Sequence, residues 1–401
     1  MSLTGKSQHW ARGAAMALAG LLACGPAAWA GDHKGAPFDF ETVPEAEPGE
    51  IDEIAALTEK LQDKRAKTDE SQDGKLLRGV HPKSHGCVAA EFVVRGDIEE
   101  KYRVGLFAQP GKVRDAWIRF SNASVLREHD LKGGKNGSRG MAIKVMGVEG
   151  EMLSEDNGQG NQDFLMINTP EFAFANVRDY LRLERILESD PLGADASPFF
   201  APAILLGMGK PELFNNLSLD EQRGTLATAK VLPKILKETV RNPMQVQYFG
   251  AAPFLFGAGR VMKFSVAPCT ATKQERFDPN TITEDDPSKD YLSDALSQTM
   301  KGSQNVCYDF KVKVRSVDAD RLNMEDATTT WPDDGTGYVN VARITVKVPQ
   351  SPDTTEALEH CEKLAFTPWH SLAAHQPLGS INRLRRKVYY NSAEHRSAGG
   401  N

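Results

Sequence analysis

Short segments of this chain alternate between apolar and polar positions, which is the two-residue period of a β-strand. They are rich in β-branched and aromatic residues, and glycine-rich turns separate several of them. The last two alternate most cleanly, as expected for strands with one face in water. The pattern therefore predicts the strands of an antiparallel barrel. These segments are residues 91–94, 115–120, 244–267, 305–314 and 338–348.

Other segments carry apolar residues at the spacing of a helix. This spacing predicts a helix over 51–69, several helices between 177 and 240, and a short helix over 354–364. Pro198 and Pro202 are expected to interrupt the middle region, because proline lacks the N–H that a helix interior needs. Strands and helices together predict an α+β fold built as one barrel-centred domain with surrounding helices.

The N-terminus has the features of a secretory signal peptide. Basic residues precede an apolar run over 14–24, and Ala28-Trp-Ala30 then provides the small-x-small pattern of a cleavage site. The run is shorter than the ~20 residues that a membrane span needs. We therefore expect residues 1–30 to be removed and the protein to be periplasmic or secreted, and we favour this over a lipoprotein anchor at Cys24.

The remaining chain divides into two parts. Residues 31–50 are rich in proline, glycine and acidic residues and predict an exposed arm, which with the following helix makes a region over 31–75. The barrel domain then extends over 76–401. The chain has 401 residues and a formal net charge of −6, which argues against nucleic acid as a partner.

Cysteines and common catalytic motifs narrow the chemistry further. Four cysteines remain after the predicted cleavage, and the residues alone leave three disulfide pairings open. The sequence contains no H-E-x-x-H, no G-x-S-x-G and no phosphate-binding glycine loop, which argues against hydrolase and nucleotide-binding functions. These cysteines are Cys87, Cys269, Cys307 and Cys361.

The C-terminal segment contains one tyrosine between two arginines, Arg385-x-x-x-Tyr389-x-x-x-x-x-x-Arg396. If Arg385 and Tyr389 share a helix, their spacing puts both on one face, where the guanidinium favours a phenolate. A phenolate binds iron(III), and tyrosine is one of the known axial ligands of haem. Arg396 could meet a haem propionate. The alternative is a basic C-terminal helix with a half-buried structural tyrosine.

A second group of motifs lies nearer the start of the barrel domain, and each combines cationic or polar residues with strand-like neighbours. Five motifs, the C-terminal one included, follow one another in an order that resembles the catalase superfamily. The four motifs that precede the C-terminal one are Arg78-Gly-Val-His81-Pro-Lys83, Arg119-Phe-Ser121, Arg139-Gly-Met-Ala-Ile-Lys144 and Ile167-Asn168-Thr-Pro170.

The resemblance implies a catalase-like antiparallel barrel, without the helical domain that follows the proximal tyrosine in ordinary catalases. It also implies a non-covalently held haem b, because no C-x-x-C-H attachment motif occurs. The family pattern assigns proton transfer to a histidine oriented by a serine, and propionate binding to arginines. Carried over, the catalytic residues are His81 and Ser121, the cofactor-binding residues Arg78, Arg119, Arg385 and Arg396, and the iron ligand Tyr389.

Two neighbouring residues compete for these roles. His85 competes with His81, and on one strand the two would share a face, so spacing alone does not decide between them. Only His81 preserves the family's R-x-x-H-x-K pattern. Tyr390 is the corresponding alternative to Tyr389.

One position departs from the family pattern. Ile167 stands where the resemblance implies an asparagine facing the iron, unless a one-residue shift brings Asn168 to the site. An apolar side chain cannot hydrogen-bond peroxide, which favours peroxidase turnover with an unknown electron donor over efficient dismutation. The predicted function is reduction of hydrogen peroxide or organic hydroperoxides. The alternatives are a hydroperoxide-rearranging haem enzyme and a non-catalytic haem-binding protein, and self-association through the arm stays open.

Overall fold

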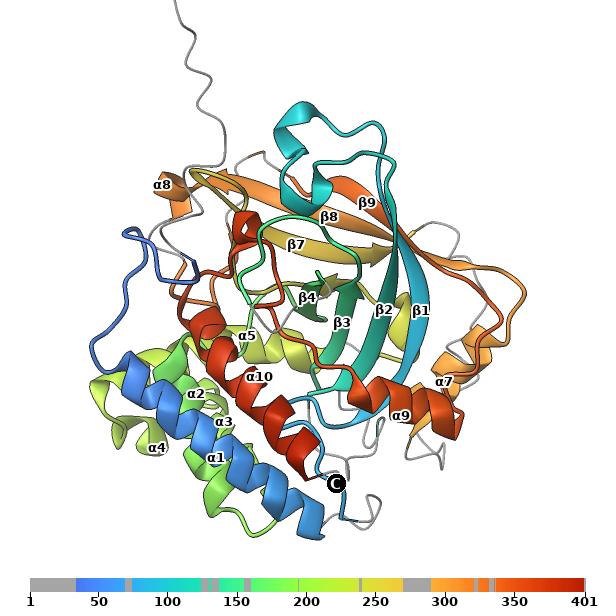
Figure 1. The fold of residues 1–401 in the computed structure, drawn as a ribbon. Coiled ribbons are helices and arrows are strands. Elements are labelled where there is room, and N and C mark those ends of the chain that lie inside the picture. Colours follow the sequence, from blue (N-terminus) through green and yellow to red (C-terminus); the bar gives the residue numbers. More distant parts are fainter. Residues whose placement is uncertain are drawn as a thin grey trace, which may run out of the picture.

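The protein is described here by a computed structural model that covers residues 34–68, 74–123, 130, 137–154, 160–193, 195–237, 240–269, 290–320, 324–331, 335 and 337–399. Within these ranges nine strands form one antiparallel sheet in the order β5-β4-β3-β2-β1-β9-β8-β7-β6. An additional pairing of β5 with β7 closes eight of the strands into a barrel, with β6 attached to β7 (Figure 1). The predicted signal peptide lies outside the described residues.

The strands confirm the alternating pattern in the sequence. The segment over 244–267 is divided into three strands because glycine and proline residues interrupt it. The strands are β1 (Ser84–Val94), β2 (Val113–Asn122), β3 (Arg139–Val145), β4 (Gln162–Ile167), β5 (Tyr248–Phe249), β6 (Phe254–Leu255), β7 (Arg260–Pro268), β8 (Val306–Ser316) and β9 (Val339–Val346).

Aromatic side chains fill the barrel interior. Phe92, Phe164, Phe264 and Phe310 are fully buried and come from four different strands. The rings of Phe164 and Phe310 meet edge to face with their centroids 4.7 Å apart, an arrangement that aromatic pairs prefer. Burial of each such side chain contributes about 1.5–3 kcal/mol. The barrel is therefore a packed core, and a ligand has to bind outside it.

Helices cover one side of the barrel, where α1 and α10 lie side by side (Figure 1). Pro202 lies inside α3, so the predicted break there was wrong; the residue is in the first two turns, where it removes only one helical hydrogen bond. The helices are α1 (Glu47–Thr68), α2 (Val177–Ser189), α3 (Ser197–Gly207), α4 (Glu212–Asn215), α5 (Leu219–Lys237), α7 (Tyr291–Met300), α8 (Val317–Asp320), α9 (Thr355–Lys363) and α10 (Ser380–Ala398).

Helix α10 has one face for packing and another for polar side chains. Ile381, Leu384 and Val388 belong to a buried cluster with α1 residues such as Ile54 and Leu61. The helix begins after Gly379, which has a φ of 81°, and a Cβ there would lie 2.1 Å from the Met324 carbonyl oxygen. Packing against α1 and this tight entry together fix the orientation of α10.

The N-terminal arm over 34–50 is exposed at most positions, as predicted, but it is also anchored to the rest of the protein. Phe38 and Phe40 are buried and stack on each other with ring centroids 5.0 Å apart. The Arg383 guanidinium of α10 then donates to Glu41 and Glu47, at 2.7 and 2.6 Å. These two acidic residues are therefore counter-ions of α10, whereas Asp39 and Glu45 are exposed.

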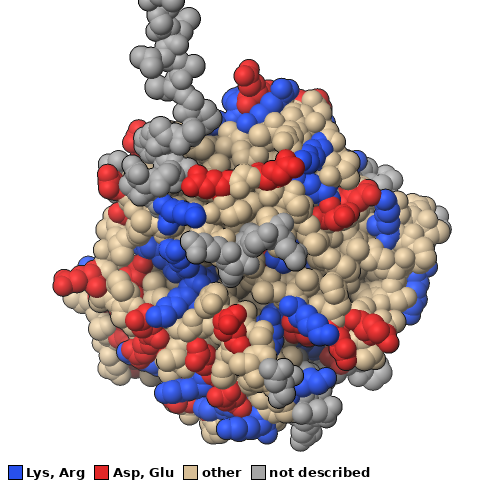
Figure 2. All heavy atoms as spheres, viewed as in Figure 1, with Lys and Arg blue, Asp and Glu red and all other residues tan. Residues whose placement is uncertain are grey.

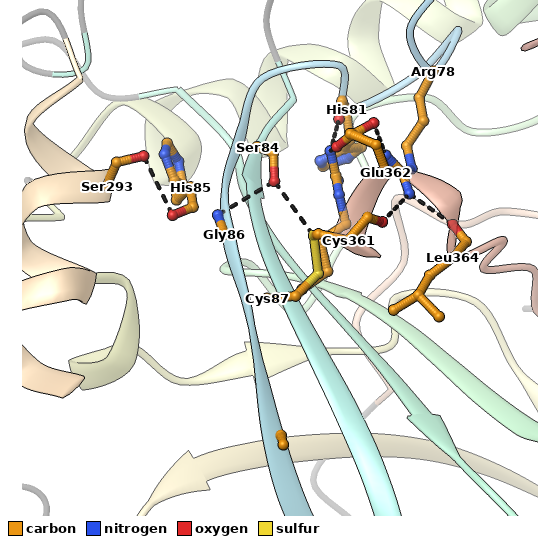
Figure 3. Close-up of a disulfide and its surroundings, with 12 residues drawn as sticks. Arg78, His81, Ser84, His85, Gly86, Cys87, Ser293, Cys361, Glu362 and Leu364 are labelled. Atoms are coloured by element: carbon orange, nitrogen blue, oxygen red, sulfur yellow. Dashed lines mark hydrogen bonds and ion pairs between the residues drawn. A yellow bond between two sulfur atoms is a disulfide. The ribbon is translucent and has the colours of Figure 1, made fainter. Parts of the chain in front are cut away.

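Two disulfides settle the pairing that the sequence left open. Cys87 of β1 is bonded to Cys361 of α9, and Cys269, which follows β7, is bonded to Cys307 of β8. The first bond joins residues 274 positions apart, so it fixes α9 against the barrel. The arrangement of Cys87, Cys361 and their neighbours is drawn in Figure 3.

Charges of both signs are mixed over the face that carries α1 and α10 (Figure 2). Exposed ion pairs such as Arg185–Glu53 and Lys387–Asp52 join α1 to α2 and α10. Such exposed pairs contribute only about 0–1 kcal/mol each, so these helices are held mainly by apolar packing and by the buried Arg383–Glu47 pair. In the part of the chain that the structure describes, none of the helices combines the length and the apolar character that crossing a membrane requires.

Candidate active site

A narrow slit lies between the barrel wall and α10. The slit has a volume of about 740 Å³ when its open mouth is included. The residues that line it come from the loop before β1, from β2 to β5 and from α10, together with Ala251 and the segment that follows α9. All seven predicted site residues line this slit: Arg78, His81, Arg119, Ser121, Arg385, Tyr389 and Arg396.

Helix α10 presents its predicted residues on one face, because they follow one another at intervals of four and seven. The shared helix of Arg385 and Tyr389 is thus confirmed. The Arg385 guanidinium is held by a 3.2 Å hydrogen bond from Nη1 to Asn382 Oδ1 and lies 5.3 Å from the centre of the Phe172 ring. Tyr390 is 52% exposed and does not line the slit, which favours Tyr389 as the ligand.

His81 lies in the loop before β1, so it does not share a strand with His85 as considered above. Its φ of 54° is in the left-handed region, which a residue with a side chain adopts at a cost of about 1–2 kcal/mol. Arg119 holds this turn, since its Nη2 donates to the His81 carbonyl at 3.0 Å. Strain of this kind is common where a side chain is aimed into a site.

The His81 ring contacts the predicted serine. Its Nδ1 is 3.1 Å from Ser121 Oγ, which leaves Nε2 for a ligand in the slit. Burial, followed by the charges of Arg119 and Arg385, lowers the pKa of His81 to about 3. The imidazole is therefore neutral at physiological pH and can accept a proton.

His85 belongs to a separate polar network. Its Nε2 is 2.8 Å from Asn122 Oδ1, its Nδ1 is 4.0 Å from Asp130, and it does not line the slit. Figure 3 shows His81 and His85 on opposite sides of the chain that leads into β1. Of the two histidines, His81 therefore lines the slit and His85 does not.

Gly140 makes room for His81, a role that the sequence analysis missed. A Cβ at this β3 position would lie 2.6 Å from His81 Nδ1 and 2.7 Å from Ser121 Oγ, closer than side chains tolerate. The Arg139-Gly140 motif pointed to a core strand, but nothing in it indicated which side chain the glycine faces.

For the peroxide turnover that the resemblance implies, we expect Gly140→Ala to displace the His81 ring and to lower the rate per bound cofactor by at least about tenfold, since small misplacements of catalytic groups have large effects on rate. Steady-state kinetics on the cofactor-loaded protein checks this. Gly137→Ala is the matched control, because the nearest atom to a Cβ there is the end of Arg139, at 3.7 Å. Equal losses in both variants would contradict the packing role.

Arg78, Arg119 and Arg396 form an arginine cluster in the slit. Burial, followed by the charge of Arg78, lowers the pKa of Arg119 to about 9, and burial and Arg78 lower that of Arg396 to about 10. Arg119 Nε is buried without a hydrogen-bond partner. The cluster therefore holds more positive charge than the protein itself balances, which favours binding of an anion.

A carboxylate that the sequence did not reveal contacts this cluster. Arg78 Nη1 donates to Glu362, and Glu362 Oε1 is 3.7 Å from Arg119 Nη2. Burial is the largest single influence on the pKa of Glu362, and it raises that pKa. The charges of Arg78 and Arg119 outweigh it, so the pKa of Glu362 lies below its ordinary value. Because Glu362 is 284 positions from Arg78, no local pattern could have predicted the contact.

The rest of the slit is largely apolar, with Ala142, Leu165, Ile167 and Phe366 among its lining residues. Asn168 does not line it, because its Oδ1 accepts a 2.8 Å hydrogen bond from the backbone N–H of Arg139. Ile167, and not Asn168, therefore lines the slit where the resemblance implies an asparagine. A largely apolar slit beside unbalanced guanidiniums favours an apolar ligand that carries acidic groups.

No protein-family model matches the chain. Curated catalases match it over a limited segment: the catalase of Staphylococcus epidermidis is 29% identical over 114 residues, which are 28% of this chain and 20% of that one. A catalase-like protein of Staphylococcus aureus is 28% identical over 114 residues, 28% of this chain and 22% of its own. The match thus spans only about a fifth of the length of these relatives.

Solved catalase structures match the chain much further. A bacterial catalase aligns with a TM-score of 0.57 at 19% identity, over 80% of this chain and 57% of its own. A fungal catalase and catalase A from Saccharomyces cerevisiae give 0.58 and 0.57 at 16% identity, again over 80% of this chain and over 59% and 61% of theirs. At such identities the structures establish the fold, and the sequence similarity is limited to the matched segment. The chain has the catalase fold, and over a segment of 114 residues its sequence is similar to that of curated catalases.

Proposed function

We propose that this protein is an exported, haem-dependent enzyme that decomposes hydrogen peroxide or organic hydroperoxides. The observation that carries the proposal is the slit itself, where a neutral histidine on the barrel side and a tyrosine on α10 line one narrow space. The similarity to catalases supports the reaction class. Export rests on the N-terminal signal pattern.

The residues of the slit suit a haem in three respects. Tyr389 would ligate the iron, with Arg385 one helical turn away to stabilise its phenolate form. The arginine cluster would bind the propionates, and Arg119 Nε would gain the partner that it lacks. When bound, the haem supplies an iron centre that exchanges electrons with peroxide.

His81 would move the proton. In the tautomer in which Nδ1–H donates to Ser121 Oγ, the Nε2 lone pair would accept the proton of a peroxide and return it to the other oxygen, so that water can leave. Arg119 contributes indirectly, because it holds the His81 backbone in its left-handed turn. Ser121 would fix the orientation of the ring through its contact with Nδ1.

The low pKa of His81 predicts an unusual pH dependence. Because the pKa lies at about 3, the imidazole stays in its proton-accepting form as the pH falls through 6.5. We expect kcat/KM per bound haem to be nearly constant from about pH 8 to pH 5. It should fall only as the pH approaches the lowered pKa of His81. An acid limb near pH 6.5 would contradict a buried, neutral His81.

Ile167 favours peroxidase turnover. Its side chain offers no hydrogen bond to a second peroxide molecule, and with Leu165 and Phe366 it gives the slit an apolar lining suited to organic hydroperoxides. The same lining supports one alternative, rearrangement of a fatty-acid hydroperoxide without net reduction.

The haem-loaded protein should be given hydrogen peroxide and, separately, cumene hydroperoxide and a fatty-acid hydroperoxide, with oxygen release, oxidation of an added phenolic donor and the organic products measured. We expect donor oxidation with little oxygen release. Brisk oxygen release would make the protein a catalase despite Ile167, and isomerised product without donor oxidation would favour rearrangement. No turnover of any peroxide by haem-loaded protein would favour a haem-binding protein without catalysis.

A further inference from the structure

Glu362 occupies a position among the arginines that the proposed cofactor would also need. Its carboxylate accepts a hydrogen bond from Arg78 Nη1 and lies 3.7 Å from Arg119 Nη2. Arg396 is close enough for the same carboxylate to act on its pKa. Two of the three cationic side chains proposed to bind propionates thus contact one carboxylate of the protein, and the third lies within range of its charge.

This carboxylate is held in place from two sides. The neighbouring Cys361 is bonded to Cys87 of β1, so the end of α9 cannot move freely from the barrel. Arg78 Nη2 also donates to the carbonyl oxygens of Cys361 and Leu364, at 3.0 and 2.7 Å (Figure 3). Both hydrogens of Nη2 are therefore engaged by the end of α9 and Nη1 by Glu362, which leaves few donors of Arg78 for a ligand.

The charges of the cluster make the contact more than an ordinary surface ion pair. Three guanidiniums face one carboxylate, and the Glu362 side chain is only 30% exposed. Like charges in a poorly solvated space repel one another strongly, so a nearby anion stabilises the ligand-free protein. A ligand that brings its own carboxylates competes for the same donors.

We propose that Glu362 is a built-in counter-ion of the arginine cluster that competes with the carboxylates of the incoming cofactor and so sets its affinity. This inference rests on the proposed haem-binding function. It predicts that Glu362→Gln has two opposite effects. The substitution should destabilise the ligand-free protein, because it removes the anion that stabilises the arginine cluster. It should strengthen cofactor binding, because it removes the competing carboxylate.

The test compares the wild type, Glu362→Gln and Glu359→Gln, a control that makes the same charge change at an exposed position of the same helix. For haem-free protein we expect Glu362→Gln to lower Tm by about 2–4 °C. We expect its Kd for hemin, from absorbance titration, to be about tenfold lower than that of the wild type. Hemin dimethyl ester, which has no free carboxylate, should bind wild type and variant equally. Glu359→Gln should match the wild type throughout.

Each other outcome has a distinct meaning. Unchanged or weaker hemin binding by Glu362→Gln would overturn the competition while leaving haem binding intact. An equal gain for hemin and its dimethyl ester would also overturn it, because the effect would then not depend on the propionates. Failure of the wild type and every variant to bind hemin would overturn the proposed function itself, and the inference with it.

Discussion

Replacing His81 by alanine is expected to lower peroxide turnover per bound haem by about 10²–10⁴-fold, the usual contribution of a positioned general base. Haem binding should change little, because His81 contacts Ser121 and the β3 backbone region and is not a proposed ligand. Stopped-flow mixing of the haem-loaded variant with hydrogen peroxide measures the first step directly. An unchanged rate would remove His81 from the mechanism.

The matched control is His85→Ala. His85 is more deeply buried than His81, and it contacts Asn122 and approaches Asp130 outside the slit. This variant should lose stability, since it leaves polar partners unsatisfied. Its turnover per bound haem should stay within about threefold of the wild type, because additivity holds for groups that do not share a site. A large kinetic loss in His85→Ala, with none in His81→Ala, would assign proton transfer to His85 and a structural role to His81.

Replacing Tyr389 by phenylalanine is expected to weaken haem binding by at least about a hundredfold, or about 2.7 kcal/mol, because the iron loses its protein ligand. The bands that arise from a phenolate bound to ferric iron should disappear from the spectrum of any haem that still binds. Absorbance titration with hemin measures both effects.

Tyr390→Phe provides the control on the same helix. Tyr390 is 52% exposed and points away from the slit lining, so its loss should leave the hemin titration and the spectrum unchanged. Retention of the phenolate bands in Tyr389→Phe, with their loss in Tyr390→Phe, would move the ligand by one residue. That result would require α10 to turn by about 100° about its axis, against the packing of Val388 and Leu384 on α1.

Much of the site could be predicted because its residues lie in short motifs whose order along the chain is distinctive. The spacing of Arg385, Tyr389 and Arg396 required only that they share a helix, which α10 confirms. The alternating segments also predicted the barrel strands, since a sheet with one packed face imposes a period of two. Local periodicity thus accounts for the strands and for α10.

Other features depend on contacts between distant parts of the chain and have no local signal. The left-handed turn at His81 is held by Arg119, and Glu362 meets Arg78 through folding and a disulfide. The acidic composition of the arm predicted its exposure but not its attachment, in which Glu41 is paired with Arg383 of α10. In each case tertiary contacts add what composition and spacing do not indicate.

The central claim is that the slit binds one haem through a tyrosine phenolate, and titration of the purified protein with hemin tests it most directly. Absorbance should saturate at one hemin per chain, and resonance Raman spectra of the complex should contain the vibrations of an iron-bound phenolate. Saturation without phenolate bands would refute Tyr389 as the ligand, and the absence of saturable binding would contradict the haem site altogether.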